Sequence, residues 1–204
     1  MIIRLELGML ETNCYIYVDE DTREGIIIDP GDDAGKILDI IKNEKIKIKY
    51  IILTHGHWDH IGVVDRIKVH TGADILIHAN DNDCLTDSTK SLSYLIGILG
   101  PSIKADRFLN DGDEISIGNT VLKVLHTPGH TSGSICMVSE GVLFSGDTLF
   151  RGAVGRTDLP GGSADDLEKS IKTKLLILGD DVQVYPGHGP NTTIGKERPA
   201  FENR

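Results

Sequence analysis

The apolar positions in the first half of the chain follow two different spacings. Some segments alternate apolar and polar residues or form short apolar runs, which is typical of β-strands. Others repeat apolar residues every three or four positions, which is typical of helices that pack by one face. These patterns predict strands at residues 2–7, 13–18, 25–29, 47–53 and 74–78, and helices at residues 34–43 and 59–70.

The second half of the chain again combines strands with helices. It predicts strands at residues 114–117, 120–125, 134–138, 142–144 and 182–185, and a helix at residues 165–178 with Ser163 as its N-cap. Residues 79–101 are polar and then apolar, and Gly97 and Gly100 weaken the helical spacing, so we expect a helix or a mobile insertion there. Because the strands form two groups, each with helices, we predict an α+β fold of two sheets packed face to face with helices outside.

Composition narrows the class of protein. A chain of 204 residues with 39% apolar residues can bury a substantial core as one domain. Its net charge of −10 disfavours a nucleic-acid or anionic-membrane partner. No apolar run approaches the ~18 residues that span a bilayer, and no signal peptide is evident, so we expect a cytoplasmic location. Three cysteines without a C-x-x-C pair argue against a disulfide framework, and Cys14 and Cys136 fit the core.

The densest group of metal-type donors directly follows the predicted strand at residues 47–53. Its sequence is Thr54-His55-Gly56-His57-Trp58-Asp59-His60. His55 and His57 would project to the same side if the strand continued through them. A lone histidine would be an ordinary loop residue, and Asp59 alone could cap a helix. Together, however, such crowded donors are unfavourable without a cation, and they suit zinc or iron.

Three later residues occupy a similar setting, a glycine-rich turn after an apolar strand. They are His130, Asp147 and His188. Strand ends at one edge of two packed sheets can meet, and glycines allow the backbone to approach closely. Each residue alone could be a turn or hydrogen-bonded loop residue. Together they supply the additional ligands that a pair of metals requires.

The complete pattern resembles the metallo-β-lactamase superfamily. That resemblance implies a four-layer αβ/βα sandwich with two divalent metal ions at one edge, most simply zinc, with iron or manganese as alternatives. It implies one metal held by His55, His57 and His130, and a second held by Asp59, His60 and His188. Asp147 would bridge the two.

Segments 145–152, 155–158 and 187–197 resemble the hydroxyacylglutathione hydrolases, the glyoxalase II group. Those enzymes usually continue into a helical glutathione-binding domain, whereas residues 1–204 resemble the short, single-domain glyoxalase II-like proteins. The resemblance implies a small-molecule thioester substrate and attack by a metal-bridging hydroxide, which Asp59 would orient or deprotonate. The cations Arg151, Arg156 and Lys196 could hold a substrate carboxylate or be ordinary surface charges.

Other activities within the superfamily remain alternatives. Residues 155–158 also resemble persulfide dioxygenases, which bind a single iron through ligands like His55, His57 and His130. A nuclease is disfavoured by the acidic charge and by the lack of an added RNA-binding domain. A β-lactamase is disfavoured because such relatives commonly carry cysteine at the position of Asp147.

Overall fold

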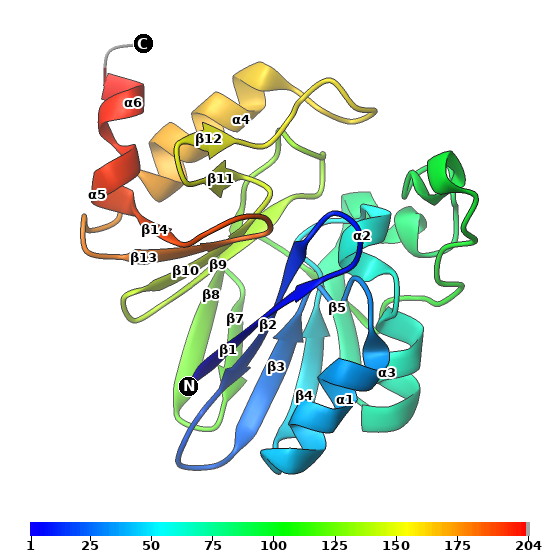
Figure 1. The fold of residues 1–204 in the computed structure, drawn as a ribbon. Coiled ribbons are helices and arrows are strands. Elements are labelled where there is room, and N and C mark those ends of the chain that lie inside the picture. The colour runs from blue at the N-terminus through cyan, green and yellow to red at the C-terminus, as the bar shows by residue number, and fades with distance from the viewer. Residues whose placement is uncertain (203–204) are drawn as a thin grey trace.

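The computed structural model describes residues 1–202 and consists of two six-stranded sheets with helices on their outer faces (Figure 1). The first sheet has the order β1-β2-β3-β4-β5-β6, and the second has the order β14-β13-β10-β9-β8-β7. Both sheets are mixed, because β3 to β6 run parallel in the first sheet and β10 pairs in parallel with β13 in the second. The predicted α+β sandwich is therefore confirmed.

The first sheet comes from the N-terminal half of the chain. Its strands are β1 (Ile2–Leu7), β2 (Thr12–Val18), β3 (Glu24–Ile28), β4 (Lys47–Ile52), β5 (Asp74–His78) and β6 (Arg107–Leu109). Its helices are α1 (Ala34–Asn43), α2 (Trp58–Ile61) and α3 (Val64–Thr71). Sequence patterning located all of these strands within one or two residues except β6, which is only three residues long.

The second sheet comes from the C-terminal half. Its strands are β7 (Glu114–Ile117), β8 (Thr120–His126), β9 (Ile135–Ser139), β10 (Val142–Gly146), β13 (Gln183–Pro186) and β14 (Thr192–Thr193). The short pair β11 (Leu149–Phe150) and β12 (Ala153–Val154) lies beside it. The helices are α4 (Ala164–Ser170), α5 (Ile194–Glu197) and α6 (Pro199–Glu202).

Three apolar layers hold these elements together. Tyr15, Ile52 and Phe144 belong to the cluster between the two sheets, so each sheet buries its inner face against the other. Ile37 of α1 and Ile67 of α3 pack on the outer face of the first sheet. A third cluster, which includes Cys136, joins α4 to the outer face of the second sheet, and Cys14 lies in the first outer cluster. Both cysteines are fully buried, as the sequence predicted.

The helix predicted at residues 59–70 is wrong in one respect, because it is two helices. The α2 helix ends before Gly62, and α3 begins at Val64. A Cβ on Gly62 would lie 2.3 Å from the carbonyl oxygen of Gly31, so the loop after β3 presses against this point. The amide of Val63 donates to the carbonyl oxygen of Pro30 rather than continuing the helix. This tertiary contact interrupts a continuous helical pattern.

Two other helical predictions also change. Residues 79–101 form two 3₁₀ segments, η1 (Ala79–Leu85) and η2 (Ser93–Ile96), because Leu92 and Gly97 adopt left-handed conformations on either side of η2. The helix predicted at residues 165–178 has the predicted Ser163 cap, which accepts from the Asp166 amide at 3.2 Å. It becomes a π-helical segment, η3 (Ile171–Leu175), after Ser170.

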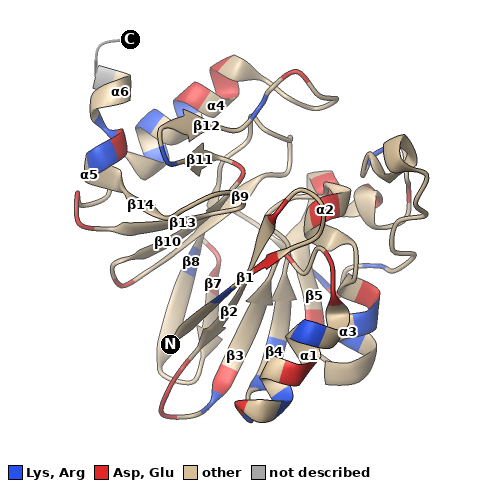
Figure 2. Ribbon diagram, viewed as in Figure 1, with Lys and Arg blue, Asp and Glu red and all other residues tan. Residues whose placement is uncertain are grey.

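No helix among residues 1–202 is long and apolar enough to cross a membrane. Lys and Arg are scattered over α1, α3, α4 and α5 rather than gathered on one broad surface (Figure 2).

Candidate metal centre

The centre lies at the sheet edge where β4, β10 and β13 end and their following loops meet (Figure 1). The strand β4 ends at Ile52, so His55 and His57 occupy a loop and not a continued strand. The amide of Gly56 donates to Asp81 Oδ2 at 2.9 Å, and the amide of Trp58 donates to the carbonyl oxygen of Ser91 at 2.9 Å. Contacts from the 79–106 segment therefore hold this loop in place.

The loop that carries His188 is tied to the first sheet. The backbone amide of Asn13 donates to the carbonyl oxygen of Gly187 at 2.7 Å. The side-chain amide of Asn13 donates to the carbonyl oxygens of Pro186 at 2.8 Å and Gly189 at 2.9 Å. Asn13 thus aligns the edges of the two sheets at the site.

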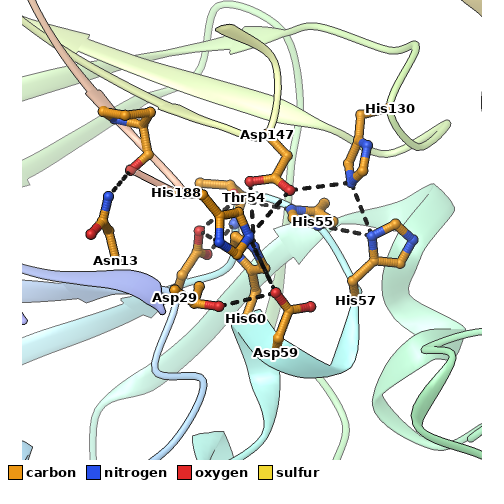
Figure 3. Close-up of polar contacts among 12 residues, drawn as sticks. Asn13, Asp29, Thr54, His55, His57, Asp59, His60, His130, Asp147 and His188 are labelled. Carbon is orange, nitrogen blue, oxygen red and sulfur yellow. Dashed lines mark hydrogen bonds and ion pairs between the residues drawn. The ribbon is translucent and has the colours of Figure 1, made fainter. Parts of the chain in front are cut away.

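One donor group consists of His55, His57 and His130, all buried. His57 Nδ1 lies 3.1 Å from His55 Nε2 and 2.9 Å from His130 Nε2 (Figure 3). Bonds of about 2.0–2.1 Å to a tetrahedral metal place neighbouring ligand nitrogens roughly 3.3 Å apart. These two separations lie within a few tenths of an ångström of that value, so the three nitrogens could hold one ion.

The second donor group consists of Asp59, His60 and His188. His188 Nε2 lies 3.3 Å from both His60 Nε2 and Asp59 Oδ2. Asp147 stands between the two groups, with Oδ2 3.6 Å from His130 Nε2 and Oδ1 3.4 Å from His60 Nε2 (Figure 3). All seven predicted ligand side chains are thus brought together, with Asp147 between the two donor groups.

Hydrogen bonds on the far side of the rings fix which nitrogens carry protons. His130 Nδ1 can only donate to the carbonyl oxygen of Arg156, at 2.8 Å, and His188 Nδ1 can only donate to that of Leu10, at 3.0 Å. His60 Nδ1 donates to Asp29 at 2.9 Å. When these three rings are neutral, the Nε2 atom of each carries no proton and points its lone pair at the centre.

Asp29 and Thr54 extend this arrangement to His55, and sequence reasoning missed both. Thr54 donates its hydroxyl to Asp29 Oδ2 at 2.6 Å, so its oxygen is left to accept from His55 Nδ1 at 3.2 Å. Asp29 consequently supports one histidine of each donor group. A signal was present: Asp29 follows an apolar strand and precedes Pro30-Gly31, the same setting as Asp147 and His188.

Electrostatics differ between the two donor groups. Burial and the neighbouring charge of His130 lower the pKa of His57 to about 3, and burial also keeps the pKa of His55 well below its usual range. Although burial opposes it, the charges of Asp147, Asp59 and Asp29 raise the pKa of His60 to about 10. The carboxylate-rich half therefore favours additional positive charge at this position.

A metal pair fits these residues. Asp147 Oδ1 is buried without a hydrogen-bond partner among the described residues, which is costly unless a cation meets it. His60 Nε2 and His188 Nε2, which both carry lone pairs in the neutral rings, lie 3.3 Å apart and repel each other unless a proton or a metal cation lies between them. Neutral imidazole and carboxylate donors suit zinc, iron or manganese.

A cavity of ≈ 450 Å³ opens above the centre. His57, Asp59 and Asp147 form part of its base, and Trp58 lines one side. Of the three cations predicted to hold substrate, Arg156 lines this cavity, and its side chain pairs with Asp158. Arg151 and Lys196 are exposed and are not among the residues that line it.

The family model of the metallo-β-lactamase superfamily matches residues 7–188. The chain belongs to this superfamily. The superfamily is largely composed of metal-dependent hydrolytic enzymes, and the donor groups described above could hold such metals.

Two relatives illustrate the similarity. An uncharacterized protein of Aquifex aeolicus is 42% identical over 203 residues, covering 97% of this chain and 94% of that protein. The hydroxyacylglutathione hydrolase GloC of Haemophilus influenzae is 38% identical over 194 residues, covering 92% of this chain and 90% of GloC.

Three solved structures share the fold over nearly the whole chain. The B3 metallo-β-lactamase BLEG-1 superposes with a TM-score of 0.93 at 38% identity. The superposition covers 99% of this chain and 100% of the BLEG-1 chain. The protein TTHA1623 in a di-iron-bound form gives 0.87 at 33% identity, with coverage of 99% and 100%. The ETHE1 protein of Myxococcus xanthus gives 0.82 at 28% identity, with coverage of 99% and 83%.

Proposed function

We propose that this protein is a metal-dependent thioester hydrolase with two divalent metal ions. His55, His57 and His130 would hold one ion, Asp59, His60 and His188 the other, and Asp147 both. The observation that carries the proposal is the convergence of histidine Nε2 lone pairs with Asp147 Oδ1, a carboxylate oxygen that has no hydrogen-bond partner within residues 1–202.

When bound, such metals supply an acidified water as nucleophile and a Lewis acid for the carbonyl oxygen. The chain's own part is to orient the reactants and to hold charge. Burial opposes ionisation of Asp59, but the neighbouring His60 and His188 outweigh it and hold the pKa of Asp59 well below its usual range. Thr12 donates to Asp59 Oδ2 at 3.0 Å and fixes the carboxylate beside the cavity. Asp59 is therefore ionised at neutral pH and placed to orient a water beside the cavity.

The thioester as substrate is supported by the similarity to GloC, which is described as a hydroxyacylglutathione hydrolase. A thiolate is also a good leaving group, so the reaction does not need a strong general acid. Zinc is the simplest choice of metal, and the di-iron form of TTHA1623 supports iron as the alternative.

A second candidate function is a mononuclear iron dioxygenase that acts on a persulfide, favoured by the similarity to ETHE1. The complete second donor group argues for two ions instead, because its three ligand atoms already face one another. β-Lactam hydrolysis is a third possibility that the similarity to BLEG-1 raises.

One set of measurements separates these activities. The protein is loaded with zinc or iron, its metal content is measured by elemental analysis, and each form is assayed. The substrates are S-lactoylglutathione and neutral thioesters, glutathione persulfide with an oxygen electrode, and a chromogenic β-lactam. We expect two metals per chain and thioester cleavage. One iron per chain with oxygen consumption, or turnover of the β-lactam alone, would refute the proposal.

A further inference from the structure

The cavity above the metal centre is lined mainly by apolar side chains. Apart from the proposed metal ligands and Arg156, every described residue that lines it is apolar or aromatic. Trp58 borders the ligand loop, and the others are Leu10, Leu92, Leu95, Phe150, Val154 and Leu159. They come from the β1–β2 loop, the 79–106 segment, the β11–β12 hairpin and the loop before α4, so apolar walls surround the site on several sides.

Positive charge is scarce in the same place. Arg156 is the single Lys or Arg among the described lining residues, and its Nε and Nη2 donate to the two oxygens of Asp158 at 2.7 and 2.8 Å. The β1–β2 loop and α2, which border the site, carry acidic residues and no Lys or Arg (Figure 2). Glutathione has a carboxylate at each end, and apart from the proposed metal ions the lining offers it one cation, Arg156, whose charge is already matched by Asp158.

Exposed apolar side chains continue the cavity surface outwards. The β1–β2 loop exposes Met9 by 74% and Leu10 by 51%, and the segment opposite exposes Leu95 by 61% and Leu99 by 91%. Large apolar side chains grouped around the mouth of a cleft typically mark a surface that binds apolar groups. Most of the large exposed apolar residues in the described part of the chain lie on these two loops.

We propose that the substrate is an uncharged thioester with a long apolar chain, bound between the β1–β2 loop and the 79–106 segment, and not a glutathione thioester. This rests on the proposed thioester hydrolase function. The chemistry of the lining requires an apolar chain but does not require it on a particular side of the thioester, so the acyl group and the thiol are tested separately.

The test uses the metal-loaded protein and N-acetylcysteamine thioesters whose acyl group grows from acetyl to octanoyl. Each buried methylene should raise kcat/KM by about fourfold until the chain leaves the cleft. Octyl thioacetate tests the thiol side, and S-octanoylglutathione should react no better than its N-acetylcysteamine counterpart. Two results would overturn the inference. One is a kcat/KM that does not increase with a longer chain on either the acyl or the thiol side, and the other is S-lactoylglutathione as the best substrate.

Variants locate the binding surface. Leu95→Ala and Leu10→Ala should each lower kcat/KM for the octanoyl thioester by about tenfold and lower that for the acetyl thioester much less. The control is Val69→Ala, which removes an apolar side chain that is also exposed, by 81%, from α3 away from the cavity and should change neither kcat/KM. Equal losses on both thioesters in both leucine variants would contradict an apolar-chain role.

A binding measurement separates this inference from the proposed reaction. The thioethers S-octyl- and S-methyl-N-acetylcysteamine cannot be hydrolysed, and calorimetry should show binding of the octyl compound and much weaker binding of the methyl compound. If the octyl thioether binds while no thioester is cleaved, the hydrolase function is refuted and the apolar site is retained. If it does not bind, the apolar site is refuted whatever the activity.

Discussion

Replacing Asp29 with asparagine should weaken metal binding in both halves of the site. Asp29 accepts three hydrogen bonds, from the Thr54 amide at 2.8 Å, the Thr54 hydroxyl at 2.6 Å and His60 Nδ1 at 2.9 Å. An asparagine has one acceptor oxygen and one donor group. If its amide nitrogen faces His60, it favours the tautomer with the proton on Nε2, which cannot bind a metal. If it faces Thr54, two N–H groups oppose each other.

The backbone tolerates this substitution. Asp29 has φ of 54°, in the left-handed region, and asparagine is among the residues that accept that conformation. Partners of metal-binding histidines typically contribute 10- to 100-fold in metal affinity, or about 1.4–2.8 kcal/mol. We expect a loss of this size, largest in the half that contains His60 and smaller in the half that contains His55. Competition with a chromogenic chelator measures both affinities.

The matched control is Asp19→Asn. Asp19 is also buried and accepts hydrogen bonds from Thr22, Asn119 and Thr120, but it joins the β2–β3 turn to the β7–β8 turn and contacts none of the proposed ligands. Its replacement should lower stability and leave metal affinity unchanged. If Asp29→Asn binds both metals as tightly as the native protein, the tautomer argument is wrong. If both variants lose metal equally, the effect is one of general stability.

Three further predictions follow from individual contacts. Asp147→Ala should lower metal content at both positions, and a variant that retains two metals at native affinity would exclude the bridge. Gly187→Ala places a Cβ 2.1 Å from Asp147 Oδ1 and 2.7 Å from His60 Cε1, so elemental analysis should show metal loss in a folded protein. Hydrogen bonds from Thr22 hold the pKa of Asp19 at about 2, below the ~3.9 of an unfolded aspartate. Its stabilisation is therefore complete above about pH 4, and the difference in Tm between native protein and Asp19→Asn should vanish as the pH falls towards 2.

Sequence patterning located most strands because alternating apolar residues suit half-buried sheets. The strands β1, β5 and β7 and the helix α1 have the predicted bounds. The errors arose where a distant contact overrides a local preference. The break between α2 and α3 depends on the loop at Pro30-Gly31, and β6 is a strand because it pairs with β5. Neither cause is visible within the segment concerned.

The sequence alone determined which chemistry is available. The histidines and aspartates that could bind metal stand after apolar strands in short polar or glycine-rich turns, and this local pattern identified all seven side chains that the structure brings together. The positions of these side chains relative to one another depend on the tertiary structure. Only the packing of two sheets, aligned at this edge by Asn13, places His188 beside Asp59 and Asp147 between the two groups.

The tertiary structure also decided what surrounds the donors. Asp29 and Thr54 orient His55 and His60 through contacts that no spacing rule describes, and the apolar wall of the cavity is assembled from loops distant in the chain. The physical reason is that side-chain donor type is a property of single residues, whereas proton position and cavity lining depend on which groups are neighbours in space.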